Sequence, residues 1–180
     1  GKKAQSETKI GCGGVSVSWA AVNMLERILG TLRCKSVLIM GAGKMSELAA
    51  SHLHNKNVGQ IYVMNRSEVK AIALAEQFNG KIVPCEKINE ILRDVDAVIC
   101  STAAGKYILN KDLIQLIMKA RACKPLVLMD ISIPRNIDPQ ISQFENVRLF
   151  TIDDLADVIQ GSIMTRYNAI AEVENIVSKK

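Results

Sequence analysis

Short apolar runs rich in β-branched residues alternate along this sequence with longer stretches of helical periodicity. We expect six strands, at Ser36–Met40, Gln60–Met64, Lys81–Val83, Ala97–Cys100, Leu126–Asp130 and Arg148–Phe150. Helices are expected between them, at Lys44–His54, Glu68–Phe78, Cys85–Leu92 and Lys111–Lys119. Nearly continuous apolar strands separated by helices are typical of a parallel sheet covered on both faces. Because the crossovers in such sheets are right-handed, the pattern predicts an α/β fold with a Rossmann-like, doubly wound parallel sheet.

Two helical segments flank this alternating core. Residues Val15–Leu29 have apolar positions at helical spacing, and Gly30 provides a stop. Residues Ile152–Val177 carry a long apolar stripe, with Asp153 and Asp154 where the helix dipole favours negative charge. Such a helix usually packs on another domain or subunit. We therefore expect a linker and helix at 1–30, a nucleotide-binding Rossmann domain at 31–150, and the start of a long C-terminal linker helix at 151–180.

The composition narrows the class of protein. Hydrophobic residues make up 48% of the 180-residue chain and charged residues 23%, enough for a sizeable core. Aromatic residues are only 4%, and the lysines and arginines behind the net charge of +5 are scattered, so no nucleic-acid site is evident. Five cysteines without a CxxC pair indicate a reducing compartment, the cytoplasm or a plant plastid, and no zinc site.

The apolar segments and the first residues indicate whether the chain crosses a membrane, carries a signal peptide or belongs to a longer protein. No apolar segment reaches the roughly 18 residues of a membrane-spanning helix, so no membrane partner is expected. The first residues are polar, unlike a signal peptide, and methionine is not the first of them. We expect the chain to be part of a longer protein.

The segment GAGKMS follows the first expected strand and opens the first expected helix, the context in which a glycine-rich turn binds a dinucleotide. Gly41 permits a tight turn, Gly43 lets the backbone approach a pyrophosphate, and the third position needs only a small residue such as Ser46. Backbone N–H groups at the helix start would face the phosphates. The alternative is a turn that contains glycines but binds nothing. The predicted contacts are Gly41, Ala42, Gly43, Lys44, Met45 and Ser46, with Lys44 and Met45 contributing backbone groups.

The end of the second expected strand indicates which dinucleotide would bind. A carboxylate there would select NAD, but this strand is followed by Asn65, Arg66 and Ser67. A guanidinium can bind the 2′-phosphate of NADPH through two hydrogen bonds, and a serine hydroxyl can donate another. In the alternative interpretation, Asn65 and Ser67 only cap the helix that begins near Glu68. Capping and phosphate binding can coexist at one helix start, so the alternative does not exclude a bound phosphate. Because an arginine is present and a carboxylate is not, we predict NADPH.

Two later strand ends lie at the edge of the sheet where ligands bind. Ser101 and Thr102 follow the fourth strand and are predicted to contact the cofactor, although a plain loop would have the same composition. Asp130 ends the fifth strand, and either an ion pair with Arg135 or contact with a substrate is possible there.

Residues able to perform catalysis are not apparent. His52 and His54 lie two residues apart near the end of the first expected helix, away from the glycine turn. Cys100 occupies a strand position expected to be buried and unreactive. We therefore assign neither catalytic nor metal-binding residues.

Five segments together resemble glutamyl-tRNA reductase, in matching order and spacing over nearly the whole chain. They are SETKIGCGGVSVSWAAV (6–22), VLIMGAGKMSELAASHL (37–53), VMNRS (63–67), AVICSTAAG (97–105) and LMDISIPRNIDP (128–139). GVSVSWAAV and DISIPRNIDP are more specific than any glycine motif. The resemblance implies an enzyme that reduces glutamyl-tRNA with NADPH to glutamate-1-semialdehyde, at the start of tetrapyrrole (haem and chlorophyll) synthesis.

Members of that family have an N-terminal catalytic domain with a nucleophilic cysteine, a central NADPH domain and a C-terminal dimerisation domain. This chain resembles the central domain, so the resemblance implies a fragment inactive by itself, glutamyl-tRNA bound through the missing domain, and a homodimer at full length. By position, residues 41–46 and 65–67 match the family's NADP contacts, with Ser46 in place of a usual glycine. The rival interpretations are a shikimate- or precorrin-type NADP dehydrogenase domain and an interaction module that binds no nucleotide.

Overall fold

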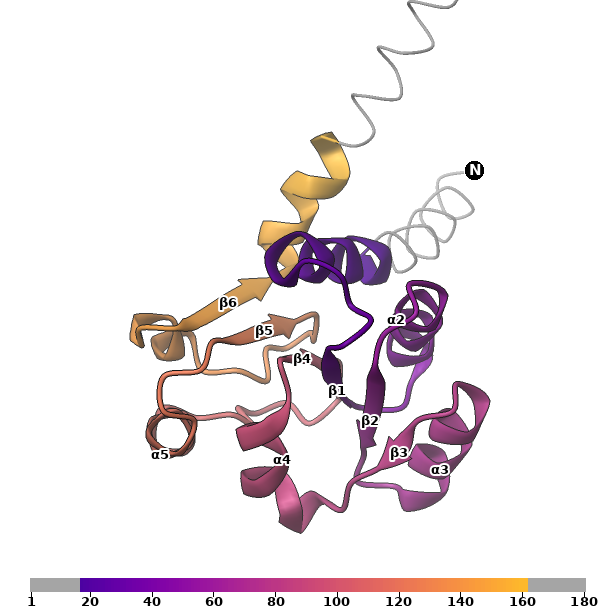
Figure 1. The fold of residues 1–180 in the computed structure, drawn as a ribbon, viewed down its shortest axis with the longest axis horizontal. Helices are drawn as coiled ribbons and strands as arrows, with labels where there is room; N and C mark the ends of the chain where they lie inside the picture. The colour runs from indigo at the N-terminus through magenta and orange to yellow at the C-terminus, as the bar shows by residue number, and fades with distance from the viewer. Residues whose placement is uncertain (1–16, 162–180) are drawn as a thin grey trace, which may run out of the picture.

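The fold is a single parallel sheet with helices on both faces. A computed structural model describes residues 17–161, and its sheet has the strand order β3-β2-β1-β4-β5-β6 with every pair parallel (Figure 1). The strands are β1 (Ser36–Met40), β2 (Gln60–Met64), β3 (Lys81–Ile82), β4 (Ala97–Cys100), β5 (Leu126–Asp130) and β6 (Val147–Thr151). The direction of winding reverses between β1 and β4, which confirms the predicted doubly wound Rossmann-like sheet.

Four of the strands begin and end at the predicted residues, and two do not. The exceptions are the edge strands: β3 ends one residue early, at Ile82, and β6 is one residue longer at each end than predicted. Each of these has only one neighbouring strand, β2 or β5, which sets how far its ladder extends. The apolar pattern identifies the central strands well because both of their faces are buried.

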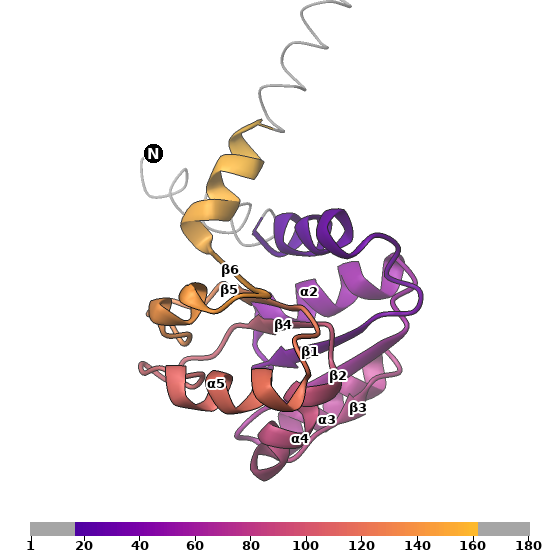
Figure 2. The ribbon, with the colours of Figure 1, turned by 60° about the vertical axis from the view of Figure 1, so that its left-hand side comes forward.

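Helices cover the two faces of the sheet in separate groups (Figures 1 and 2). One hydrophobic cluster joins the first face to α2 (Lys44–Asn55), α3 (Glu68–Gln77) and the helices at residues 17–29 and 152–161. The other cluster joins the second face to α4 (Ile88–Asp94), α5 (Lys111–Ala120) and the short 3₁₀ helix η2 (Pro139–Gln143). Among residues 17–161, no helix has the length and apolar character needed to cross a bilayer.

Two local predictions need correction. The helix expected at Cys85–Leu92 is divided into the 3₁₀ helix η1 (Cys85–Lys87) and α4, because the Lys87 N–H donates to the Pro84 carbonyl at 2.9 Å and tightens the first turn. The helix η2 was not predicted. It begins where the Asp138 carboxylate accepts the Gln140 N–H at 2.9 Å, a short local bond that leaves no apolar periodicity in the sequence.

The flanking helices were predicted correctly as far as the structure describes them. The first ends at Leu29, and the next residue, Gly30, has a φ of +79° that suits a residue without a Cβ atom. The second begins after Thr151, whose N–H donates to the Asp154 carboxylate at 2.8 Å, so Asp154 acts at the helix start as expected. Val15, Ser16 and residues 162–177 lie outside the described residues, and the three domain boundaries stay predictions.

A buried arginine joins α4, α5 and β5 at the amino edge of the sheet. Arg121 is 5% exposed, and its guanidinium donates to the carbonyl groups of Leu92, Arg93, Val95, Lys124 and Pro125. Burial lowers its pKa, and the nearby carboxylates of Asp96 and Asp94 oppose that effect. Five carbonyls therefore depend on one side chain.

Replacing Arg121 with lysine should lower the free energy of unfolding by about 2–4 kcal/mol, because a single ammonium cannot reach all five carbonyls and leaves several of them unsatisfied. Urea unfolding followed by circular dichroism measures the change. Arg93→Lys is the control, since the Arg93 side chain is exposed, and it should change stability by less than about 0.5 kcal/mol. Equal effects of the two substitutions would contradict this role.

A candidate dinucleotide site at the carboxyl edge of the sheet

The glycine turn between β1 and α2 lies against the end of β4. Gly41 has a φ of +114°, and a Cβ atom on it would come within 2.1 Å of the Ser101 carbonyl oxygen. The Gly41 N–H donates to Met64 at 2.9 Å, and the Ser101 N–H donates to Met40 at 2.8 Å. Glycine is therefore required at this position for two reasons, the positive φ angle and the close contact with the end of β4.

Gly43 differs because the fold does not require it to be glycine. It is the N-cap residue of α2 with a φ of −86°, and a Cβ atom on it would have no neighbour within 4 Å. No side chain caps this helix start, so its first N–H groups have no side-chain acceptor. The missing side chain leaves open space beside those donors, as a bound phosphate would need.

Ser46 occupies the third position of the motif and is fully buried. Its Oγ lies 3.1 Å from the Cβ position built on Gly41, and within the described part of the chain this oxygen has no hydrogen-bond partner. A larger side chain would meet the turn itself. The sequence therefore needs a small residue here for close packing, as predicted.

The segment after β2 forms one wall of a cleft. Asn65 donates its side-chain amide to the Ser67 carbonyl at 3.1 Å, and the Ser67 Oγ accepts the Lys70 N–H at 3.5 Å as the N-cap of α3. The capping interpretation is therefore correct for Ser67. Arg66 and Lys70 are exposed, and the structure places neither within 4.0 Å of a carboxylate among residues 17–161.

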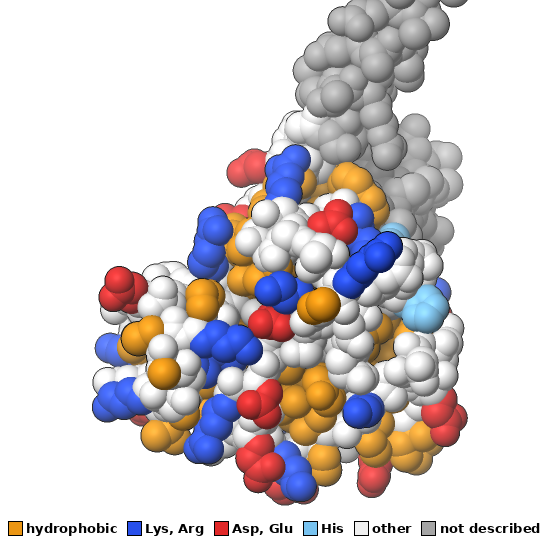
Figure 3. All heavy atoms as spheres, viewed as in Figure 1, with side chains coloured by type: hydrophobic (Ala, Val, Ile, Leu, Met, Phe, Trp, Pro, Cys, Tyr) orange, Lys and Arg blue, Asp and Glu red, His pale blue; other side chains and the backbone are white. Residues whose placement is uncertain are grey.

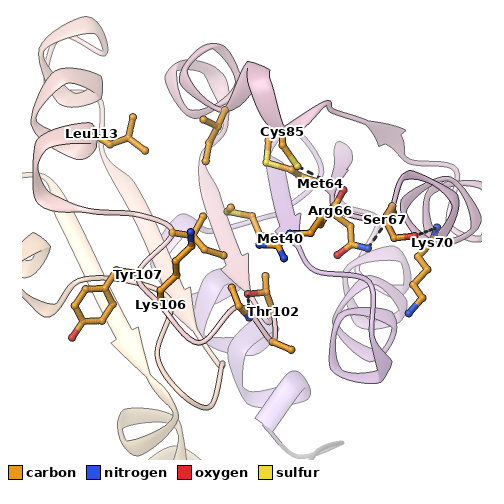
Figure 4. A pocket seen from close by; sticks show the side chains of 15 residues that line it. Met40, Met64, Arg66, Ser67, Lys70, Cys85, Thr102, Lys106, Tyr107 and Leu113 are labelled. Atoms are coloured by element: carbon orange, nitrogen blue, oxygen red, sulfur yellow. Dashed lines mark hydrogen bonds between the residues drawn. The ribbon is translucent and has the colours of Figure 1, made fainter.

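The cleft has a volume of about 810 Å³ and lies between this wall, the loop after β4, and the starts of α4 and α5 (Figure 4). Its lining residues are Met40, Met64, Asn65, Arg66, Ser67, Lys70, Cys85, Ile88, Thr102, Ala103, Ala104, Lys106, Tyr107, Ile108 and Leu113. Four predicted site residues line it: Asn65, Arg66, Ser67 and Thr102. The glycine turn and Ser101 do not, although the turn follows directly after Met40, which does.

The sequence prediction did not include Lys70 or Lys106 in this site. Lys70 follows the N-cap Ser67 by three residues, and that spacing places the two residues on the same side of α3. The sequence therefore contained enough information to predict Lys70 beside Ser67. Lys106 lies in a loop, where spacing carries no such signal. Neither residue belongs to the glycine motif.

The loop after β4 is held by a buried polar network. Asn136 is fully buried, and its Oδ1 accepts both the Thr102 hydroxyl at 2.7 Å and the Thr102 N–H at 3.2 Å. The Ser132 hydroxyl donates to the Cys100 carbonyl at 3.1 Å. Asp130 accepts the N–H groups of Ser132, Asn136 and Ile137 at 2.9–3.1 Å. Thr102 therefore has a fixed position.

The possible ion pair between Asp130 and Arg135 is not formed. Asp130 is 1% exposed and uses its carboxylate on local backbone donors, whereas Arg135 pairs with Asp153 at 2.8 Å. Backbone N–H groups close to a carboxylate in sequence bind it more readily than a side chain that also has a solvent-exposed partner.

The expected non-catalytic residues lie away from the cleft. His52 and His54 occupy the last turn of α2, opposite the glycine turn, and burial together with Lys56 lowers the pKa of His52. Cys100 is buried as predicted, and burial raises the pKa of its thiol, with the Asp130 carboxylate adding to the effect. Cys85 is the cysteine among residues 17–161 that lines the cleft, and it is exposed.

A family model for shikimate/quinate 5-dehydrogenase matches residues 23–158 of this chain. The chain belongs to that family. A dehydrogenase nucleotide-binding domain of this kind indicates a nicotinamide cofactor.

Among individual proteins, the chain is similar to several glutamyl-tRNA reductases. The chain is 42% identical over 99% of its length to the glutamyl-tRNA reductase of Syntrophotalea carbinolica, and 44% identical over 98% to that of Geobacillus kaustophilus. The glutamyl-tRNA reductase structure from Methanopyrus kandleri superimposes with a TM-score of 0.84 at 32% identity, over 99% of this chain and 45% of that one. Shikimate dehydrogenase from Aquifex aeolicus, at 21% identity and a TM-score of 0.58, shares the fold.

These matches confirm the resemblance to the central domain of glutamyl-tRNA reductase. The chain spans about two fifths of the length of the curated relatives, 40% and 39% for the two bacterial proteins. Because the chain matches only this part of the relatives, the similarity alone does not assign the reaction of the full-length relatives to this chain.

Alanine should affect stability at one glycine of the turn and cofactor binding at the other. Gly41→Ala should lower the free energy of unfolding by at least about 3 kcal/mol, because of its backbone angle and the contact with Ser101. Gly43→Ala should lower the free energy of unfolding by no more than about 1 kcal/mol, the usual cost of alanine at an N-cap, yet weaken nicotinamide dinucleotide binding about 10-fold or more by filling the open space. Thermal unfolding and fluorescence titration measure the two effects. Unchanged binding by Gly43→Ala would contradict a phosphate site at this turn.

Proposed function

We propose that this chain binds NADPH and is the nucleotide-binding domain of a glutamyl-tRNA reductase. The observation that carries the proposal is the wall after β2, where a serine and two cations line the cleft without a carboxylate. An acidic residue at this position would accept the ribose 2′-hydroxyl of NADH and repel a 2′-phosphate. The cations favour the phosphate instead.

The residues present fit the adenosine half of that cofactor. Arg66 offers a planar guanidinium, Ser67 a hydroxyl, and Lys70 an ammonium at the first turn of α3, where the helix dipole also favours an anion. Apolar side chains on both sides of the cleft, among them Ile88 and Leu113, suit an adenine ring. The site therefore matches a 2′-phosphorylated adenosine in charge and shape.

The pyrophosphate would lie at the glycine turn. The first N–H groups of α2 are without a side-chain cap, and the space at Gly43 is open. Thr102, fixed by Asn136, and Ser101, beside Gly41, would then border the ribose and nicotinamide. This extends the site from the cleft past Met40 to the end of β4.

In the intact enzyme the cofactor would supply a hydride to the glutamyl group presented by a separate catalytic domain. The contribution of this chain would be to bind and orient the cofactor, a positioning role that removes much of the entropy cost of the reaction. Glutamyl-tRNA would be bound through that other domain, and a homodimer would form at full length. On the face drawn in Figure 3, basic side chains are interspersed with acidic ones, which gives no continuous surface for RNA.

A shikimate-type dehydrogenase is the closest rival, since the family model carries that description. Such an enzyme would need its own acid or base beside the nicotinamide. The two described histidines lie at the far end of α2, and Cys100 is buried. The similarity to glutamyl-tRNA reductases over 99% of the chain favours the proposed function.

Arg66→Ala should raise the Kd for NADPH about 10-fold or more and leave the Kd for NADH unchanged within about 2-fold, because the lost guanidinium contacts only the 2′-phosphate. Fluorescence titration of both cofactors measures this. Arg93→Ala removes an exposed arginine at α4, which does not line the cleft, and should affect neither Kd. If wild type binds both cofactors equally and Arg66→Ala changes nothing, the choice of NADPH is wrong.

Cys85 provides a reporter of cleft occupancy. Saturating NADPH should slow its alkylation at least about 5-fold, because adenosine bound in the cleft would cover the thiol. Cys34 and Cys123 are exposed but do not line the cleft, so their rates should stay the same. Peptide mapping by mass spectrometry separates the sites. Protection of all three cysteines, or of none, would show that the cofactor does not occupy this cleft.

A further inference from the structure

The cleft has an excess of positive charge that extends to both of its walls. Arg66 and Lys70 lie on the wall after β2, and Lys106 lies on the loop after β4. The lining includes no aspartate or glutamate, and none of the three cations ion-pairs with a carboxylate of residues 17–161. Like charges that face one cleft repel one another unless an anion lies between them.

The backbone of Lys106 is fixed from inside the protein. The side-chain amide of the fully buried Asn136 donates to the Lys106 carbonyl at 3.1 Å. The backbone carbonyl of Asn136 accepts the Ile108 N–H at 2.6 Å. Asn136 also accepts two bonds from Thr102, so one residue holds both ends of the 102–108 segment. Less entropy is lost when a side chain on such a fixed loop binds a ligand.

The direction of the side chains agrees with this arrangement. In Figure 4, Lys106 and Arg66 extend from opposite walls toward the same space above Thr102, whereas the neighbouring Tyr107 points away from it. Lys106 therefore faces the part of the cleft that holds the 2′-phosphate in the proposed function. A phosphate with a charge near −2 can accept hydrogen bonds from both walls at once.

We infer that Lys106 is a further specificity-determining residue, which binds the 2′-phosphate of the adenosine from the wall opposite Arg66. This inference rests on the proposed function. It extends the recognition of the 2′-phosphate beyond the residues after β2, and it makes Asn136 a positioning residue that holds Lys106 in place. A cofactor without the 2′-phosphate gains nothing from this contact.

The test compares 2′,5′-ADP with 5′-AMP in titrations of the purified chain by isothermal calorimetry. Lys106→Met removes the charge and keeps the length, and should weaken 2′,5′-ADP binding about 5- to 10-fold while 5′-AMP binding changes less than about 2-fold. Lys106→Arg should retain most of the affinity. Lys111→Met is the control, an exposed lysine at the start of α5 that does not line the cleft, and should leave both ligands unaffected. Thermal unfolding confirms that each variant is folded.

The outcomes separate the inference from the proposed function. If wild type binds 2′,5′-ADP no better than 5′-AMP, the proposed function fails. If wild type prefers 2′,5′-ADP and Lys106→Met keeps that preference, or weakens both ligands equally, the proposed function stands and the inference is overturned. An equal loss in Lys111→Met would also overturn it, because the effect would then be one of net charge, screened by salt.

Discussion

The contact between the glycine turn and the end of β4 is the constraint on which the site depends. Gly41 packs on the Ser101 carbonyl where the winding of the sheet reverses, and strands diverge from that point in both directions. A side chain at Gly41 would separate β1 from β4, and the first turn of α2 would move with it. The open space at Gly43 and the start of the loop after β4 are both positioned by this one close approach.

The two walls of the cleft are built in different ways. The wall after β2 consists of a capped helix start whose Arg66 and Lys70 are exposed, so their side chains can adapt to a ligand. The wall after β4 is fixed by a buried network that runs from Asp130 through Asn136 to Thr102, and the polar atoms of this network find partners at 2.7–3.2 Å. Such a network is costly to break, because each group left unpaired in the interior loses its compensation for desolvation.

Much of the fold follows from the sequence, and the exceptions have physical causes. The central strands were predicted to the residue because burial on both faces makes them nearly continuous apolar runs. Local backbone bonds that leave no periodicity, as in η2, were missed. At the site, Arg66 was predicted because it lies two residues after the end of β2, whereas Lys106 was missed because only the tertiary fold brings its loop opposite Arg66. Of the two alternatives for Asp130, the ion pair with Arg135 does not form, because nearby backbone N–H groups compete with a side-chain cation.

A crystal structure of this chain with NADPH would show directly where the 2′-phosphate and the pyrophosphate bind. We expect the 2′-phosphate in the cleft, with at least one oxygen within about 3.2 Å of the Arg66 guanidinium. We also expect the pyrophosphate against the N–H groups at the start of α2, beside Gly43. A cofactor bound elsewhere, or one whose 2′-phosphate points to solvent away from Arg66, would contradict the proposed NADPH site.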